Sequence, residues 1–461
     1  MTMARELGAW AASRALQHLS SEAVAALKIR LLDSLGCAIA ALGAPPMQLA
    51  RAQLEDFGGD PRCTLIGGGA SAPDRAAFYN GALVRYLDFN DSYLAPGETC
   101  HPSDNLAPVL AAAEYAQCSG DDFLVALAVA YQVQCRLSDV APVRQKGFDH
   151  TTQGSYAVAA GVARALGLDA ERTANAVAIA GTAFNALRVT RTGNLSHWKG
   201  FAYPNTAFGA THAAFLAMRG ITGPEEVFEG NKGFMGSIAG RFEMDWAKED
   251  LDRLTQTILK KYNAEIHSQS AIEGLLELQQ EHGFAAKEVA AIELDIFDVA
   301  FHIIGGGEEG GKKAIRTKEE ADHSLPYVLA VALLDGTVMP AQYEPERIRR
   351  SDVQSLLQEV TVRQDDALSR RFPAEMPCRI TVRLADGAPL HREKSDYEGF
   401  LTRPMAWEGA VEKFERLTAP ILDSYQQKEI AVYVSKLENL PLAELTAILG
   451  KVRRRQRKAS A

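Results

Sequence analysis

Five polar segments interrupt a sequence that is otherwise rich in apolar residues, and each combines histidine or lysine with hydroxyl, amide or carboxylate groups. Histidine has a pKa near neutral pH, which suits proton transfer, and lysine binds anions. Any one segment taken alone has a simpler explanation as a helix cap or a hydrogen-bonded core histidine. Five together favour a site that holds an anionic substrate and moves protons. The segments are residues 88–101, 148–152, 196–200, 260–269 and 321–327.

The stretch from Tyr86 to Asn105 holds the densest group of polar residues. It lies between residues 75–84 and residues 106–113, two apolar stretches that are typical of buried helices. A loop in such a position must hydrogen-bond its polar groups internally or face a cavity, because buried polar groups without partners are costly. We therefore expect an active-site loop here.

Other kinds of site find little support in the sequence. Residues 306–312 nearly match a phosphate-binding loop, but Lys313 stands where a serine or threonine would hold Mg²⁺. No GxSxG nucleophile motif is present. Four side chains of metal-ligand type follow no metal-binding spacing, so we expect no metal ion. They are Asp88, Asp91, His101 and His150.

The bulk properties are those of an ordinary globular protein. The chain has 461 residues, more than one hydrophobic core usually supports, so two domains are expected. Its net charge of −9 argues against nucleic-acid binding, and we interpret the basic run at residues 451–458 as a solvated end. The six scattered cysteines suggest neither a disulfide framework nor a zinc ribbon. Without a visible signal peptide or an apolar run long enough to span a bilayer, we expect a cytoplasmic protein that engages no membrane.

The spacing of apolar residues predicts helices throughout the first part of the chain. One helix begins after Ser20 or Ser21, which caps it together with Glu22, and ends before Gly43. Small residues in the following helices allow close approach, so we predict a compact helical bundle. These alanine-rich helices are expected at residues 105–117, 121–137, 153–166, 170–187 and 206–219.

Strand patterns begin only after about residue 260. Residues 289–297 and 379–384 have strand character, and Asp386-Gly387 predicts a hairpin turn to another strand at residues 390–394. A sheet with one apolar face needs helices to cover it.

Helical periods at residues 325–334 and 351–358 provide that cover, and a helical period returns from residue 405. We predict three segments: an all-helical domain at residues 1–264, an α+β domain at residues 265–400, and helices at residues 401–461 that return to the first domain.

The sequence resembles the MmgE/PrpD family in its block His101–Asn105, which follows Tyr86–Asp91. That family includes 2-methylcitrate dehydratase, cis-aconitate decarboxylase and an iminodisuccinate epimerase. The resemblance implies a mainly α protein, with a large all-helical domain formed by both chain ends and a smaller α+β lid domain, usually as a homodimer. It also implies a small polycarboxylate substrate and no metal, iron–sulfur cluster or organic cofactor. Further blocks in family order lie at residues 31–37, 198–200, 262–269 and 322–327.

The resemblance places seven residues at the family's active site. They are Asp88, Ser92, His101, His150, Lys199, Lys260 and Tyr327. We add three residues from the same blocks as substrate-binding groups: Glu265, His267 and His323. Because Tyr327 belongs to the predicted lid domain and His101 to the helical domain, the expected site lies at the interdomain cleft.

The reaction that the resemblance favours is dehydration of a hydroxy-tricarboxylate, such as 2-methylcitrate to 2-methyl-cis-aconitate. A base must remove a weakly acidic C–H proton while an acid protonates the departing hydroxyl group. We assign His101, supported by Asp88, as the base and Tyr327 or His150 as the acid, although the residues equally allow the reverse. Cationic or donor groups must hold the substrate carboxylate as charge develops, and the candidates are Lys199, Lys260 and His267.

Three positions differ among members of the family and bear on which of the family's reactions this protein catalyses. Glu265 stands where the decarboxylase branch carries histidine, which favours dehydration. Cys100 replaces a glycine of dehydratase-like relatives, and its side chain could narrow the pocket. Asn263 replaces a usual proline, which should affect the turn more than the chemistry. The alternatives are decarboxylation of cis-aconitate, epimerisation of a related polycarboxylate, and a helical protein that binds an organic acid without catalysis.

Overall fold

The computed structural model describes residues 1–193, 195–308 and 310–453, which form two compact units. Unit 1 comprises Met1–Arg191, Trp198–Thr257 and the described part of Ala406–Ala461, and unit 2 comprises the described residues of Thr192–His197 and Ile258–Met405. The domain boundaries expected after residues 264 and 400 lie a few residues from these. The short stretch Thr192–His197 was not expected to join the second unit. Most of the basic end and one residue of the glycine-rich loop lie outside the described residues.

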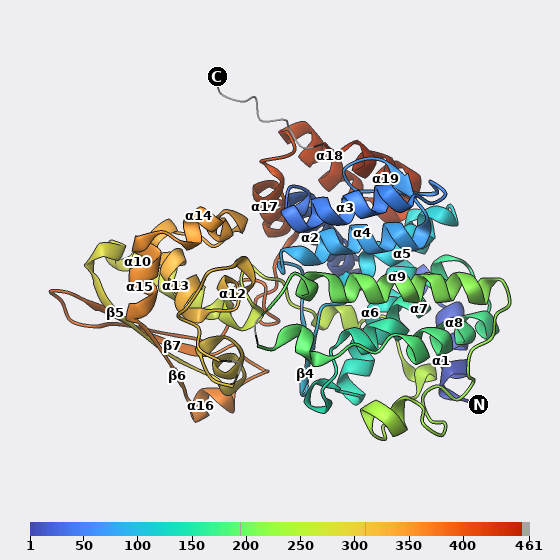
Figure 1. Cartoon of the computed structure of the whole chain (residues 1–461), viewed down its shortest axis with the longest axis horizontal. Helices are drawn as coiled ribbons and strands as arrows, with labels where there is room; N and C mark the ends of the chain where they lie inside the picture. Colours follow the sequence, from blue (N-terminus) through green and yellow to red (C-terminus); the bar gives the residue numbers. More distant parts are fainter. Residues whose placement is uncertain (194, 309, 454–461) are drawn as a thin grey trace. The chain divides into compact units, whose positions relative to one another are not determined.

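Unit 1 is a bundle of helices drawn from both ends of the chain. In Figure 1 the C-terminal helices lie beside the N-terminal ones, and α17 and α18 contact α2. The helices are α1 (Met3–Ala12), α2 (Ser21–Ala41), α3 (Pro45–Phe57), α4 (Pro73–Tyr86), α5 (Leu106–Tyr115), α6 (Gly120–Val140), α7 (Thr151–Ala165), α8 (Ala170–Ala183), α9 (Trp198–Met218), α17 (Trp407–Thr418), α18 (Ser424–Ser435) and α19 (Leu442–Lys451).

The predicted helix starts follow from local caps. The Ser20 side chain accepts a hydrogen bond from the Ala23 amide at the start of α2, and Ser119 accepts from the Asp122 amide at the start of α6. By length and composition α6 alone among the described helices could cross a membrane, yet 83% of its apolar window is buried. It is therefore a core helix of unit 1.

Helix α9 differs from the prediction because it begins at Trp198 rather than near residue 206. Pro204 lies inside it and cannot donate a backbone hydrogen bond. The helix continues because it packs against α4, α7 and α8, and tertiary packing outweighs the local penalty. The earlier start places Lys199 in the first turn of a helix.

Unit 1 is mainly helical, as predicted, and its described residues also contain four short strands. Two short antiparallel pairs occur, β1 (Cys63–Thr64) with β2 (Ala70–Ser71), and β3 (Tyr93–Ala95) with β4 (Glu98–Cys100). The second pair lies within the polar loop between α4 and α5. Strands of two or three residues leave too little period-two pattern to be recognised in a sequence.

Unit 2 contains a four-stranded sheet in the order β6-β5-β7-β8. The strands are β5 (Val289–Ile296), β6 (Val360–Gln364), β7 (Cys378–Leu384) and β8 (Leu390–Lys394). The predicted hairpin joins β7 and β8, with Val382 opposite Leu390. Strand β6, which pairs parallel with β5, was not predicted.

Helices α10 (Gln269–His282) and α13 (Leu325–Asp335) contact strands of this sheet and one another. The shorter helices are α11 (Asp298–Ala300), α12 (Lys318–Ala321), α14 (Pro345–Ile348), α15 (Ser351–Leu356) and α16 (Asp366–Ser369). The predicted helix at residues 351–358 is therefore α15 followed by a 3₁₀ turn.

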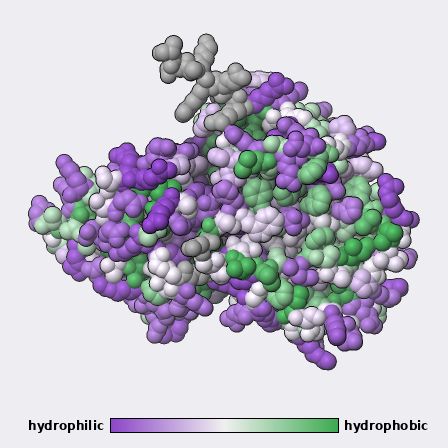
Figure 2. Space-filling model, viewed as in Figure 1, coloured by the Kyte–Doolittle hydropathy of each residue, from purple (hydrophilic) through white to green (hydrophobic). Residues whose placement is uncertain are grey.

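The two units differ in the surface that Figure 2 shows. The visible face of unit 2 is mainly hydrophilic, whereas that of unit 1 also carries hydrophobic patches. Large exposed apolar side chains of unit 1 include Leu187, Val189 and Phe208. Exposed apolar patches of this kind are common at protein interaction surfaces.

Candidate active site

The loop between α4 and α5 buries almost all its polar side chains by bonding them to one another. The Asn90 amide donates to Ser103 Oγ at 2.9 Å and to Asp104 Oδ1 at 2.8 Å. Asp91 accepts from the Ser103 amide, from the Ser103 hydroxyl and, at 2.9 Å, from the Tyr131 hydroxyl. This network fixes the backbone on both sides of His101.

His101 is held in one tautomer by the backbone. Its Nδ1 lies 2.7 Å from the Asp91 carbonyl oxygen and 3.2 Å from Ser92 Oγ. A carbonyl can only accept, so Nδ1 carries the proton and the lone pair of the neutral ring is on Nε2. The partner of Nδ1 is thus the Asp91 backbone carbonyl, with Ser92 Oγ as a second contact, and the expected support of His101 by Asp88 stays a prediction.

The Asp88 carboxylate forms ion pairs with two cationic side chains. Its carboxylate lies 2.7 Å from Arg85 Nη1 and 3.1 Å from Lys199 Nζ, and all three side chains are buried. Burial alone would lower the pKa of Arg85, but the charges of Asp88 and Asp104 raise it above its usual value. Burial raises the pKa of Asp104 to about 7, against the opposing charge of Arg85.

His150 lies beside His101, just before the first turn of α7. The two ring centroids are 5.3 Å apart in an edge-on arrangement, and the Tyr203 ring stacks on His150 at 6.0 Å. Both ring nitrogens of His150 are buried and have no hydrogen-bond partner among the described residues. Burial lowers the pKa of His150 to about 3, although the charge of Asp149 opposes this. The ring is therefore neutral at pH 7.

Asp149 connects His150 to two arginines that sequence reasoning missed. Its carboxylate lies 3.7 Å from His150 Nε2, 2.6 Å from Arg191 Nε and 3.8 Å from Arg188 Nη1. Burial alone would raise the pKa of Asp149, but the charges of Arg191 and Arg188 hold it well below its usual range. The only sequence signal was a pair of arginines spaced three apart in a short polar break, which is too common to identify a site.

Unit 2 brings together the other predicted substrate-binding residues. Glu265 accepts from the His267 amide at 2.8 Å and lies 2.7 Å from His267 Nδ1, which leaves His267 Nε2 buried without a partner among the described residues. Burial opposes ionisation of Glu265, but the charges of His267, His323 and Lys260 lower its pKa to about 2. The side chains around Glu265 that can donate hydrogen bonds to a carboxylate ligand are His267, His323 and Lys260.

His323 and Tyr327 lie at the start of α13. The Asp322 carboxylate lies 2.6 Å from both His323 Nδ1 and Lys318 Nζ. The cap is Ser324, which accepts from the Tyr327 amide at 3.1 Å. The Tyr327 hydroxyl donates to the Gln342 carbonyl, and burial raises the pKa of that hydroxyl.

Two departures from the family pattern have structural explanations. Cys100 is buried in an apolar cluster with Tyr93, Ala95 and Cys135, so it packs into the core of unit 1. The Asn263 amide donates to the Val338 carbonyl at 2.9 Å, a bond that a proline could not make. The Asn263 backbone N–H therefore ties this segment to the segment that contains Val338, and the expected effect on the turn stays a prediction.

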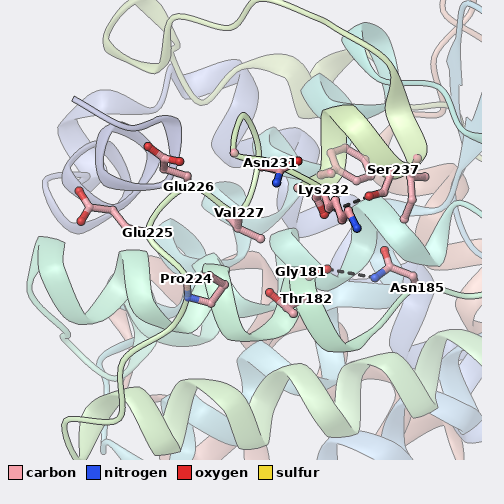
Figure 3. A pocket seen from close by; sticks show the side chains of 14 residues that line it. Gly181, Thr182, Asn185, Pro224, Glu225, Glu226, Val227, Asn231, Lys232 and Ser237 are labelled. Atoms are coloured by element: carbon pink, nitrogen blue, oxygen red, sulfur yellow. Dashed lines mark hydrogen bonds between the residues drawn. The ribbon is translucent and has the colours of Figure 1, made fainter.

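A separate cavity of about 820 Å³ opens in unit 1 between the end of α8 and residues 224–238 (Figure 3). Asn185 lies on its wall and donates to the Gly181 carbonyl at 3.1 Å. None of the ten predicted site residues lines this cavity, and its lining contains no histidine. We therefore place the candidate chemistry at the histidine pair and not here.

The helical unit contains two adjacent buried imidazoles and a buried lysine–carboxylate pair. Groups of these types let an enzyme move protons on an anionic substrate. Comparison with known proteins identifies the family. Residues 5–247 match the MmgE/PrpD N-terminal domain and residues 262–439 match the MmgE/PrpD C-terminal domain. The chain belongs to the MmgE/PrpD family.

Its relatives carry two different activities in their names. The chain is 29% identical over 451 residues to 2-methylcitrate dehydratase of Cupriavidus necator, covering 90% of each chain. It is 28% identical over 444 residues to the Escherichia coli protein of the same name, again covering 90% of each. It is 25% identical over 451 residues to the cis-aconitate decarboxylase of Mus musculus, covering 92% of this chain and 88% of the mouse protein.

Proposed function

We propose that this protein is a hydro-lyase that converts 2-methylcitrate, or a close hydroxy-tricarboxylate, into the corresponding unsaturated acid and water. The observation that carries the proposal is the 2.7 Å contact between His101 Nδ1 and the Asp91 carbonyl oxygen, which makes Nε2 the ring nitrogen that can act as the base. The names of the dehydratase relatives support the substrate class.

The base in this proposal is His101. Its Nε2 removes the proton from the carbon next to a substrate carboxylate, the C–H electrons form the double bond, and the C–O bond breaks. Negative charge develops on that carboxylate while the proton is leaving and before the C–O bond has broken, and a nearby cation stabilises it. The cation that we assign to this role is Lys199, whose Nζ lies 3.1 Å from the Asp88 carboxylate. The residues proposed to bind further substrate carboxylates are Lys260, His267 and His323.

The acid must carry a proton at neutral pH and donate it to the departing hydroxyl. Burial raises the pKa of Tyr327 and lowers that of His150, so Tyr327 is the protonated member of the pair. We therefore assign the acid to Tyr327, whose hydroxyl would exchange the Gln342 carbonyl for the leaving oxygen. His150 then acts as a neutral hydrogen-bonding group beside the base. No metal or cofactor is part of this proposal.

The test is a product assay on purified enzyme with 2-methylcitrate, citrate and cis-aconitate. Formation of 2-methyl-cis-aconitate from 2-methylcitrate is the expected result. Release of CO₂ from cis-aconitate without any dehydration would assign the protein to the decarboxylase activity, which the mouse relative keeps open. Inversion of an optically active polycarboxylate without loss of water would indicate an epimerase. Calorimetric binding of citrate with no turnover would indicate a binding protein.

We also infer a cytoplasmic homodimer. None of the six cysteines, all of which are described, forms a disulfide, which suits a reducing compartment. Unit 1 also exposes apolar side chains such as Leu187 and Phe208. Light scattering on the purified protein should give twice the 49.9 kDa mass of one chain. A mass of one chain at micromolar concentration would contradict this.

A further inference from the structure

Lys413 of the C-terminal helix α17 contacts Phe89 in the polar loop, the residue that follows Asp88. Its Nζ donates to the Phe89 carbonyl oxygen at 2.8 Å and lies 3.7 Å from the centroid of the Phe89 ring. The same nitrogen lies 2.6 Å from the Asp33 carboxylate of α2. All three residues are buried.

The residue before Phe89 has a strained backbone. Asp88 has a φ of 54°, in the left-handed region that non-glycine residues seldom adopt. Such a conformation persists only where the surrounding contacts enforce it. In this conformation the Asp88 carboxylate lies 2.7 Å from Arg85 Nη1 and 3.1 Å from Lys199 Nζ.

The position of Lys413 is itself fixed by close helix packing. A Cβ atom at Gly36 of α2 would lie 3.1 Å from the Phe414 ring of α17, so glycine permits this approach. Burial raises the pKa of Asp33, while the neighbouring Lys413 charge opposes that rise. The ion pair therefore compensates both buried charges and directs the ammonium group to the Phe89 carbonyl.

We propose that Lys413, held by Asp33, is a positioning residue that keeps Asp88 in its left-handed conformation and thereby places Lys199 for the substrate. The role of Lys199 toward the substrate rests on the proposed function, whereas the effect of Lys413 on the Asp88 conformation does not. The C-terminal helices would then fix the conformation of the active-site loop in addition to completing the helical bundle.

The test compares variants of two lysines that both join α2 to the C-terminal segment. Lys413→Met removes the bond to the Phe89 carbonyl. Because this leaves Asp33 buried without its cation, the double variant Asp33→Asn/Lys413→Met removes both charges and protects the fold. The matched control is Lys28→Met, since Lys28 lies 2.8 Å from Glu438 and donates to the Ser435 carbonyl, with no contact to the loop among the described interactions.

The readouts are a crystal structure of the double variant and steady-state kinetics of all variants. We expect Asp88 to leave the left-handed region, its distance to Lys199 Nζ to increase, and kcat to fall about 10- to 100-fold, as for a displaced catalytic group. Lys413→Arg, which can still donate to the carbonyl, should recover most of kcat, and Lys28→Met should keep wild-type kcat.

An unchanged Asp88 conformation in the double variant, with Lys199 still about 3.1 Å away, would overturn the proposal. An equal loss of kcat in Lys28→Met would overturn it as well, since the effect would then be general destabilisation. If the wild-type enzyme dehydrates no polycarboxylate, the proposed function fails, and the crystal structure alone decides the role of Lys413.

Discussion

Replacing His150 by asparagine should remove an acid-sensitive contribution to the stability of unit 1. Burial lowers the pKa of His150 to about 3, whereas an unfolded chain has a histidine pKa of about 6.5. As the pH falls below 6.5, the unfolded chain binds a proton that the folded protein does not. The stability that neutral His150 provides is therefore present above pH 6.5 and is lost as the pH falls toward 3.

Linkage gives the size of this loss. Each pKa unit corresponds to about 1.4 kcal/mol. The contribution of His150 to the wild-type free energy of unfolding should therefore fall by about 2 kcal/mol between pH 7 and pH 5. Asp104 acts in the opposite direction over the same range, because burial raises its pKa to about 7 and protonation then favours the folded state. The comparison must therefore be between wild type and variant at each pH, which cancels the contribution of Asp104.

The assay is urea unfolding followed by tryptophan fluorescence at pH 5, 7 and 8. It reports on unit 1, since all four tryptophans lie there: Trp10, Trp198, Trp246 and Trp407. Relative to His150→Asn, the wild-type free energy of unfolding should fall by about 2 kcal/mol from pH 7 to pH 5. It should stay level between pH 7 and pH 8. A difference that is the same at pH 5 and pH 7 would refute the account of His150 as a buried neutral ring.

Three further outcomes are expected. Although burial opposes it, cationic partners lower the pKa of Glu273 to about 2, so Glu273→Gln should cost unit 2 about 3 kcal/mol at pH 7, a cost that disappears as the pH falls from about 4.5 to 2. Hydrogen exchange of α10 would measure it. Gly154→Ala should lower both the melting temperature and kcat, because its Cβ would lie 2.4 Å from the Tyr203 ring, an overlap worth about 1–3 kcal/mol. Lys199→Met should lower kcat/KM for a tricarboxylate at least about tenfold, and an unchanged value would remove Lys199 from the site.

The sequence predicts those helices and strands that are determined by neighbouring residues, such as caps and turn residues. Helix α2 follows from its Ser20 cap and its apolar spacing, and the β7–β8 hairpin follows from Asp386-Gly387. Strand β6 could not be predicted in the same way. Only Val360 of its five residues is buried, and its parallel pairing with β5 depends on contacts distant in the sequence.

The same limit applies to the candidate site. The polar loop and its histidine could be predicted, because residues of those types stand out against apolar helices. The support of His101 by the Asp91 carbonyl could not, since a backbone carbonyl has no residue signature. The left-handed conformation of Asp88 and its link to Lys413 likewise depend on a helix more than three hundred residues away in the chain.

The most direct test of the central claim is a time course of 2-methylcitrate by nuclear magnetic resonance with the wild-type enzyme and with His101→Ala. The account predicts that the wild type forms 2-methyl-cis-aconitate and that the variant is at least about a hundredfold slower in kcat, the low end for a general base. The control His212→Ala, which removes an exposed histidine of α9, should keep wild-type kcat. Near-normal dehydration by His101→Ala would contradict the assignment of the base and, with it, the mechanism proposed for this site.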